Sequence, residues 1–188
     1  MNVRETKRNL YKRLNDSAEA NGVVFFGSDC FVGIPFGELS RDFCVDTPVY
    51  NRSIRGLSVY DAEKLLPECV YQLKPAKVFV NLGDADLANA DFDLDRFLAA
   101  YEWLLYTLHA HCKSQIYTVS VLSGHPMAAR ANEGIKQIAK SAGCDFLDIS
   151  DALNSDCQEV QVFQHIRHHL RTHAIDFAEA FQIASAAQ

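Results

Sequence analysis

Short apolar runs rich in β-forming residues alternate along this chain with segments of helical periodicity, and this alternation constrains the fold more than any other feature. Strands are expected at residues 23–26, 48–51, 78–82, 116–122 and 144–149. Helices are expected roughly at residues 3–20, 59–72, 93–112, 128–142 and 174–186. Continuous apolar runs suit strands covered on both faces, and alternating strands and helices form right-handed crossovers. The sequence therefore predicts a three-layer α/β/α, flavodoxin-like fold with a parallel sheet of about five strands.

The length and net charge of the chain limit its domain organisation and the partners that it can bind. A chain of 188 residues suits one compact domain, which we expect to span residues 1–188. The net charge of −6 provides no basic face for nucleic acid. No apolar run approaches the roughly 20 residues that cross a bilayer, and the N-terminus lacks a signal-peptide pattern. We expect a cytoplasmic protein with no membrane span, and its six cysteines show no paired spacing and are expected as reduced thiols.

The ends of the predicted strands indicate where a ligand site would lie. In open parallel sheets, ligands bind at the carboxyl ends of the strands, near the point where the strand order reverses. This rule selects residues 27–30, 53–56, 83–86 and 123–126, which follow four of the predicted strands.

Four of the chain's segments resemble, in order, the motif blocks of the SGNH (GDSL-type) hydrolases along nearly the whole chain. The segments are VVFFGSDCF, NRSIRG, KPAKVFVNLGDAD and HIRHHLRTHAIDFAEAF. The resemblance implies the SGNH-hydrolase fold. It also implies acyl chemistry with a serine nucleophile, a histidine base and backbone donors that stabilise the oxyanion.

The first block differs from the family pattern at the nucleophile. The family has Gly-Asp-Ser, whose Ser attacks the substrate, whereas this chain has Gly27, Ser28 and Asp29. By strict alignment Asp29 takes the nucleophile position. Ser28 serves if the turn shifts by one residue, and Cys30 if it shifts the other way. A helix cap or structural hydrogen bond is the alternative role for Ser28 and Asp29.

The other blocks keep the glycines and lose polar groups. The resemblance assigns oxyanion-hole roles to Gly56 and Gly83, both of which are also expected to serve backbone shape. Ala85 replaces the family's donor Asn, while Asp86 is kept. In the last block, Asp-x-x-His, the best register places His169 at the base and Ile166 at the Asp.

Two functions are compatible with this pattern. The first is an SGNH-like hydrolase of small carboxylic esters or acyl groups. It would use Ser28 with His169 and an oxyanion hole at Gly56 and the 28–29 turn. The second is a non-catalytic descendant that keeps the cleft to bind a small molecule or a partner protein. Asp84, Asp86 and His125 are expected to line this cleft.

No cofactor is expected, and two sets of residues offer metal ligands as alternatives. His165, His169 and His173 share a helical spacing that suits zinc. Asp29, Asp84 and Asp86 could converge with His169 on a divalent cation. No recognised metal or phosphate-loop motif accompanies either set, so no metal is assigned.

Overall fold

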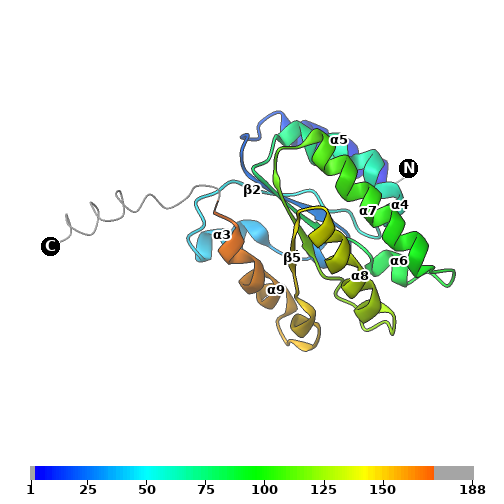
Figure 1. Cartoon of the computed structure of the whole chain (residues 1–188). Coiled ribbons are helices and arrows are strands. Elements are labelled where there is room, and N and C mark those ends of the chain that lie inside the picture. Colours follow the sequence, from blue (N-terminus) through cyan, green and yellow to red (C-terminus); the bar gives the residue numbers. More distant parts are fainter. Residues whose placement is uncertain (1–2, 172–188) are drawn as a thin grey trace.

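The computed structural model describes residues 3–171 and contains a five-stranded parallel sheet with helices on both faces (Figure 1). The strands are β1 (Val23–Gly27), β2 (Val49–Asn51), β3 (Lys77–Asn81), β4 (Gln115–Val119) and β5 (Asp145–Leu147). They pair in the order β2-β1-β3-β4-β5, and every pairing is parallel. The predicted α/β/α fold is thereby confirmed.

The helices follow the predicted pattern in part. They are α1 (Val3–Asn15), α2 (Asp29–Val32), α3 (Phe36–Asp42), α4 (Val59–Ala62), α5 (Leu66–Cys69), α6 (Asp84–Leu87), α7 (Leu94–His111), α8 (Ala128–Ser141) and α9 (Gln158–Ile166). Short 3₁₀ turns are η1 (Glu63–Leu65), η2 (Tyr71–Leu73), η3 (Ser150–Asn154) and η4 (Arg167–His169). Within residues 3–171, none of the helices combines the length and apolar character that crossing a bilayer requires.

Several departures from the predicted helices matter for the site, among them the short helices α2 and α6, which were not predicted. The segment predicted as one helix at 59–72 is broken into α4, η1, α5 and η2. Pro67 lies in the first turn of α5 and has no N–H to continue an earlier helix. Helix α9 was not predicted, and the helix predicted at 174–186 lies outside the described residues.

Alternate residues of each strand supply two separate cores. In β1, Val24 and Phe26 pack on one face while Val23 and Phe25 pack on the other, as the two-residue period of a strand requires. Helices α1, α4, α5, α7 and α8 cover the first face, and α2, α3 and α9 cover the second. Figure 1 shows α7 and α8 on the side of the sheet opposite to α3 and α9.

The second core is built around stacked aromatic rings. Phe79 at the centre of β3 is fully buried. Its ring lies 4.9 Å from that of Phe25 on β1 and 4.6 Å from that of Tyr117 on β4, both nearly parallel to it. These contacts bind the three central strands on the face that α9 covers.

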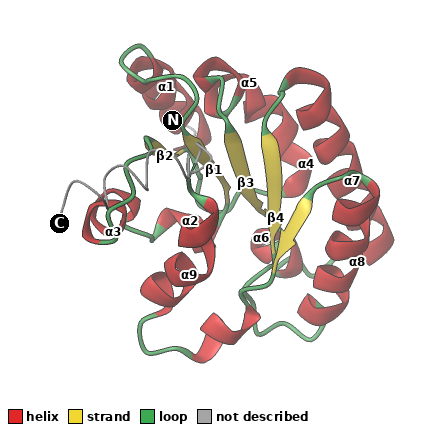
Figure 2. Cartoon of the chain, turned by 60° about the vertical axis from the view of Figure 1, so that its left-hand side comes forward, coloured by secondary structure: helices red, strands yellow, loops and turns green. Residues whose placement is uncertain are grey.

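The strand order reverses direction between β1 and β3, the central pair of the sheet. The carboxyl ends of these strands lead into α2 and α6, which Figure 2 shows at the end of the sheet to which the strand arrows point. By the rule for open α/β sheets, this is the expected ligand site.

Candidate functional site

Ser28 directly follows β1 and does not face solvent. Its side chain is fully buried, and its backbone N–H donates to the Asn81 carbonyl at 3.0 Å. Its hydroxyl donates to Oδ2 of Asp29 at 3.0 Å. The hydroxyl is thus next to a carboxylate acceptor, but a substrate carbonyl has no direct access to it.

Asp29 begins α2, and its half-exposed carboxylate receives several donors. The backbone N–H of Gly56 donates to Oδ2 at 2.7 Å, a short distance typical of a bond to a charged acceptor. The Arg55 guanidinium donates to Oδ1 at 3.2 Å. One of the amides that the resemblance assigns to the oxyanion hole therefore bonds to the chain's own carboxylate.

Asp84 accepts a hydrogen bond from the second amide, the backbone N–H of Asp29. Its Oδ2 accepts the backbone N–H of Asp29 at 3.1 Å, and its Oδ1 accepts the N–H of Ala85 at 3.0 Å. Burial raises the pKa of Asp84, with a further contribution from the charge of Asp29, although its hydrogen bonds act in the opposite direction. The 28–29 turn is thus also bonded to a carboxylate.

The two glycines of the predicted oxyanion hole shape the loops. Gly56 has φ of +65° and Gly83 has φ of +131°, conformations that side-chain-bearing residues rarely adopt. A Cβ on Gly83 would also lie 2.6 Å from a methyl carbon of Val121. Both positions therefore require glycine whatever the site does.

Asp86, on α6, is hydrogen-bonded to the start of α4. It is 5% exposed, and its carboxylate accepts the Ser58 hydroxyl at 2.5 Å and the Val59 N–H at 3.1 Å, at the start of α4. Burial raises its pKa, and the bonds from Ser58 and Val59 act in the opposite direction. Asp86 therefore caps α4 in this structure.

The NRSIRG block has a similar anchoring role. The Asn51 amide donates to the Phe31 carbonyl at 2.7 Å and so ties β2 to α2. The Arg52 guanidinium lies 5.1 Å from the Tyr11 ring and 5.4 Å from the Tyr50 ring, and it bonds to Oδ1 of Asn15 on α1. The loop that carries Gly56 is held by these contacts.

His169 lies at the other end of the sheet. Its carbonyl accepts a hydrogen bond from Lys77, the first residue of β3, and its ring lies 5.2 Å from that of Tyr117. Helix α9 begins near the carboxyl ends of the strands and runs back, so the residues after it reach the amino ends. The structure therefore does not bring His169 to Ser28, so the predicted Ser28–His169 pair does not form.

Glu159 lies where that base was expected. It sits in the first turn of α9 and lines a cavity of about 190 Å³ together with Asp29, Cys30 and Asp84. Asp156 and Glu159 repeat the spacing of the family's Asp-x-x-His block directly before and at the start of a helix. This register is not evident from the sequence because Glu159, and not a histidine, takes the last position of the block.

The electrostatics of this cavity are acidic. Asp29, Asp84 and Glu159 are its charged lining residues, with no Lys, Arg or His of the described chain among them. Burial raises the pKa of the Cys30 thiol to about 12, and the neighbouring charges of Asp84 and Glu159 act in the same direction. Cys30 is therefore a neutral thiol and not a thiolate nucleophile at neutral pH.

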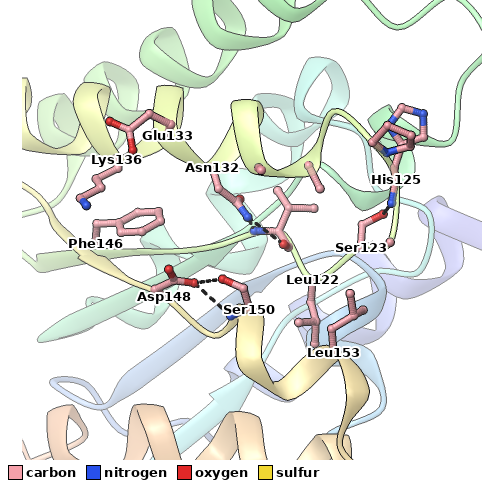
Figure 3. Close-up of a pocket in the computed structure, with 15 residues that line it drawn as sticks. Leu122, Ser123, His125, Asn132, Glu133, Lys136, Phe146, Asp148, Ser150 and Leu153 are labelled. Atoms are coloured by element: carbon pink, nitrogen blue, oxygen red, sulfur yellow. Dashed lines mark hydrogen bonds between the residues drawn. The ribbon is translucent and has the colours of Figure 1, made fainter.

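A second cavity of about 360 Å³ adjoins the first beyond the ends of β4 and β5. Leu122 lines both cavities. Figure 3 shows Asp148 and Ser150 on one side of this second cavity and Ser123 with His125 at its far end. His125 therefore lines this neighbouring cavity, while its Nδ1 accepts the Met127 N–H at 3.2 Å.

His169 lies away from Asp29 and Asp84, with which it would form one of the two alternative metal sets. Among residues 3–171, no three His, Cys, Asp or Glu side chains are grouped so as to hold a metal ion. His165 instead pairs with Asp151 at 2.8 Å. His173 lies outside the described residues.

Asp84 gives a testable pH effect. Because its pKa is raised on folding, the folded state holds this proton more tightly, so its contribution to stability is full at low pH and falls as pH rises. As the pH rises from about 4 to about 7, we expect the free energy of unfolding of Asp84→Asn to increase relative to that of the wild type. Urea unfolding at both pH values tests this. Exposed Asp91→Asn is the control, and the same gain in that variant would contradict the assignment.

Comparisons with known proteins agree on the fold. No family model matches the chain, and no curated protein matches its sequence. A Streptococcus pneumoniae protein, provisionally described as a platelet activating factor, has a TM-score of 0.77 at 17% identity and aligns over 90% of this chain and 93% of its own. A GDSL-like lipase from Bacteroides thetaiotaomicron has a TM-score of 0.70 at 18% identity, covering 87% and 96%. The acetylxylan esterase Axe2 from Geobacillus stearothermophilus has a TM-score of 0.67 at 15% identity, covering 84% and 98%.

These identities establish architecture and leave the chemistry to be argued from the site. The similarity spans nearly the full length of each solved structure. The chain therefore has the fold of the SGNH (GDSL-type) hydrolases.

Proposed function

We propose that this protein is a non-catalytic SGNH-fold protein that binds a small amine-bearing molecule in its carboxylate-lined cleft. One observation carries the proposal. The backbone amides of Gly56 and Asp29, which the resemblance assigns to the oxyanion hole, donate instead to the carboxylates of Asp29 and Asp84.

This arrangement opposes acyl transfer. A serine hydrolase stabilises the negative oxygen of its tetrahedral intermediate with donors aimed at an empty position, and losing one donor costs about 10²–10³ in rate. Here both amides have a partner, and the third donor is replaced by Ala85. Two carboxylates beside the same position would repel the oxyanion.

The same groups favour a positive ligand. Asp29, Asp84 and Glu159 line one small cavity, and Arg55 is paired with Oδ1 of Asp29 but does not line the cavity. A protonated amine in this cavity would meet carboxylate acceptors, and charge-assisted hydrogen bonds of this kind are stronger than neutral ones. The cavity of about 190 Å³ suits only a small group.

A second function, hydrolysis of small carboxylic esters, is favoured by one contact. The Ser28 hydroxyl donates to the Asp29 carboxylate, which is a possible base. In this scheme the 28–29 turn opens to expose Ser28 and releases the Gly56 amide. The fold shared with GDSL-like esterases is consistent with it.

Two measurements separate these functions. We expect the wild type to hydrolyse p-nitrophenyl acetate no faster than Ser28→Ala and to leave a fluorophosphonate probe unreacted. Turnover or labelling that disappears in Ser28→Ala would establish the hydrolase and overturn the binding proposal.

Binding is tested with a matched pair of probes, n-butylamine and n-butyrate. We expect calorimetry to detect the amine and not the acid, and Glu159→Gln to weaken amine binding by about tenfold. Glu133→Gln, on α8 beside the neighbouring cavity, makes the same charge change and is the control. Equal binding of the two probes would contradict a carboxylate site.

A further inference from the structure

A separate cavity lies at the amino ends of the strands, opposite the carboxylate cleft. It has a volume of about 490 Å³, within the range of pockets that hold small molecules. The loops that lead into β1, β3 and β4 form it together with the last turn of α7. The proposed function does not account for it, although Lys74, Pro75 and Ala76 belong to the KPAKVFVNLGDAD segment.

The charge of this cavity is opposite to that of the cleft. Lys74, Lys113 and His111 line it, and no Asp or Glu of the described chain is among the lining residues. Within residues 3–171, neither lysine has a carboxylate oxygen within ion-pairing distance. On a chain of net charge −6, this grouping of cations attracts an anion and is not neutralised from within.

The cavity wall is held in place by hydrogen bonds between the loops. The Ser114 hydroxyl donates to the Pro75 carbonyl at 2.6 Å, and the Asn21 N–H donates to the Lys74 carbonyl at 3.0 Å. Asn21 and Lys74 both have left-handed backbones, with φ of 64° and 44°. A ligand therefore meets a preformed wall and needs to order little of the chain.

Two of the lining residues, Tyr71 and His111, form an aromatic pair. The rings of Tyr71 and His111 stack with centroids 4.9 Å apart and 16° between planes. Both bond to the Thr107 carbonyl, the Tyr71 hydroxyl at 3.3 Å and Nδ1 of His111 at 2.9 Å. A carbonyl only accepts, so Nδ1 carries the hydrogen and Nε2 bonds to no described residue.

We infer that this cavity binds a nucleoside phosphate. In this inference Lys74, before β3, and Lys113, before β4, contact the phosphate, and the base lies against the Tyr71–His111 pair. Ring stacking on aromatic side chains and ammonium contacts to phosphate are the two recurrent ways in which proteins hold such molecules.

The test is calorimetric titration with AMP, adenosine and inorganic phosphate at low ionic strength. We expect the affinity for AMP to be at least about tenfold higher than that for phosphate, because stacking of one base on an aromatic side chain raises affinity by about that factor. Lys74→Asn/Lys113→Gln is expected to weaken AMP binding at least tenfold, about the effect of losing charge-assisted bonds. Asn is chosen at position 74 because it tolerates the left-handed backbone.

The control is Lys136→Gln/Lys140→Gln on α8, which makes the same change in net charge at another surface. We expect its AMP affinity to stay within about twofold of the wild type. Equal weakening in both double variants would show general charge attraction and overturn the site. AMP binding no tighter than phosphate would overturn the assignment to a nucleoside, and no AMP binding at millimolar concentration would overturn the proposal entirely.

Discussion

A variant carrying Asp29→Ser, Asp84→Ala, Ala85→Asn and Glu159→His is expected to hydrolyse p-nitrophenyl acetate at least about a thousandfold faster than the wild type. The first two changes remove the carboxylates that now accept the amides of the oxyanion hole. Ala85→Asn adds the missing donor, and each donor contributes about 10²–10³ in rate.

The fourth change supplies the base. Glu159 lines the same cavity as Asp29, and Asp156 precedes it by the three-residue spacing of the family's Asp-x-x-His block. A histidine at position 159 would therefore have the Asp156 carboxylate three residues before it, at the spacing of the family block. Steady-state kinetics and fluorophosphonate labelling measure the gain.

The matched control has Asp29→Ala in place of Asp29→Ser, with the other three changes kept. We expect it to remain inactive, because it has the donors and the base without a nucleophile. Equal activity in the two variants would show that the chemistry does not pass through position 29. If the variant with all four substitutions folds but hydrolyses the ester no faster than the wild type, the claim that the two carboxylates block the site is contradicted.

Phe79→Ala is expected to lower the free energy of unfolding by about 3–5 kcal/mol, a large share of the stability of a typical domain. Phe79 is fully buried, and its ring is stacked between Phe25 and Tyr117. The truncation leaves a cavity at the centre of the sheet and ends both ring contacts. Urea unfolding followed by circular dichroism measures the loss.

Phe92→Ala serves as its control. Phe92 is only partly buried and contacts one ring, that of Phe97, at a centroid distance of 5.5 Å. We expect a loss of about 1 kcal/mol there. A loss at Phe79 no greater than that at Phe92 would show that the aromatic stack does not hold the three central strands together.

The strands and the parallel sheet were predictable from the sequence because their signals are local. Each strand is an apolar run buried on both faces, and the amphipathic stripe at 93–112 predicts α7 within one residue at each end. Where the predicted helices differ from the structure, the causes are also local. Pro67 interrupts the helical run at 59–72, and α9 is too short for its period to stand out.

The error at His169 has a different origin. Residue types alone pointed to the histidine-rich segment at 165–173, whereas the position of a base depends on where the last described helix begins relative to the sheet. Helix α9 runs from the carboxyl ends of the strands back to their amino ends. Its first turn and the residues after its last turn therefore lie at opposite ends of the strands. Which charged residue enters the cleft is set by that direction.

The sequence by itself determined the layered fold, the loops that carry the site and the loss of the family's Ser, Asn and Asp at their motif positions. It did so because burial and turn chemistry act on neighbouring residues. Only the tertiary structure decided that Gly56 donates to Asp29, that Asp29 donates to Asp84 and that Glu159 joins them. These groups lie 27 or more residues apart in the chain, and the short-range forces between them act only after the sheet has brought its loops together.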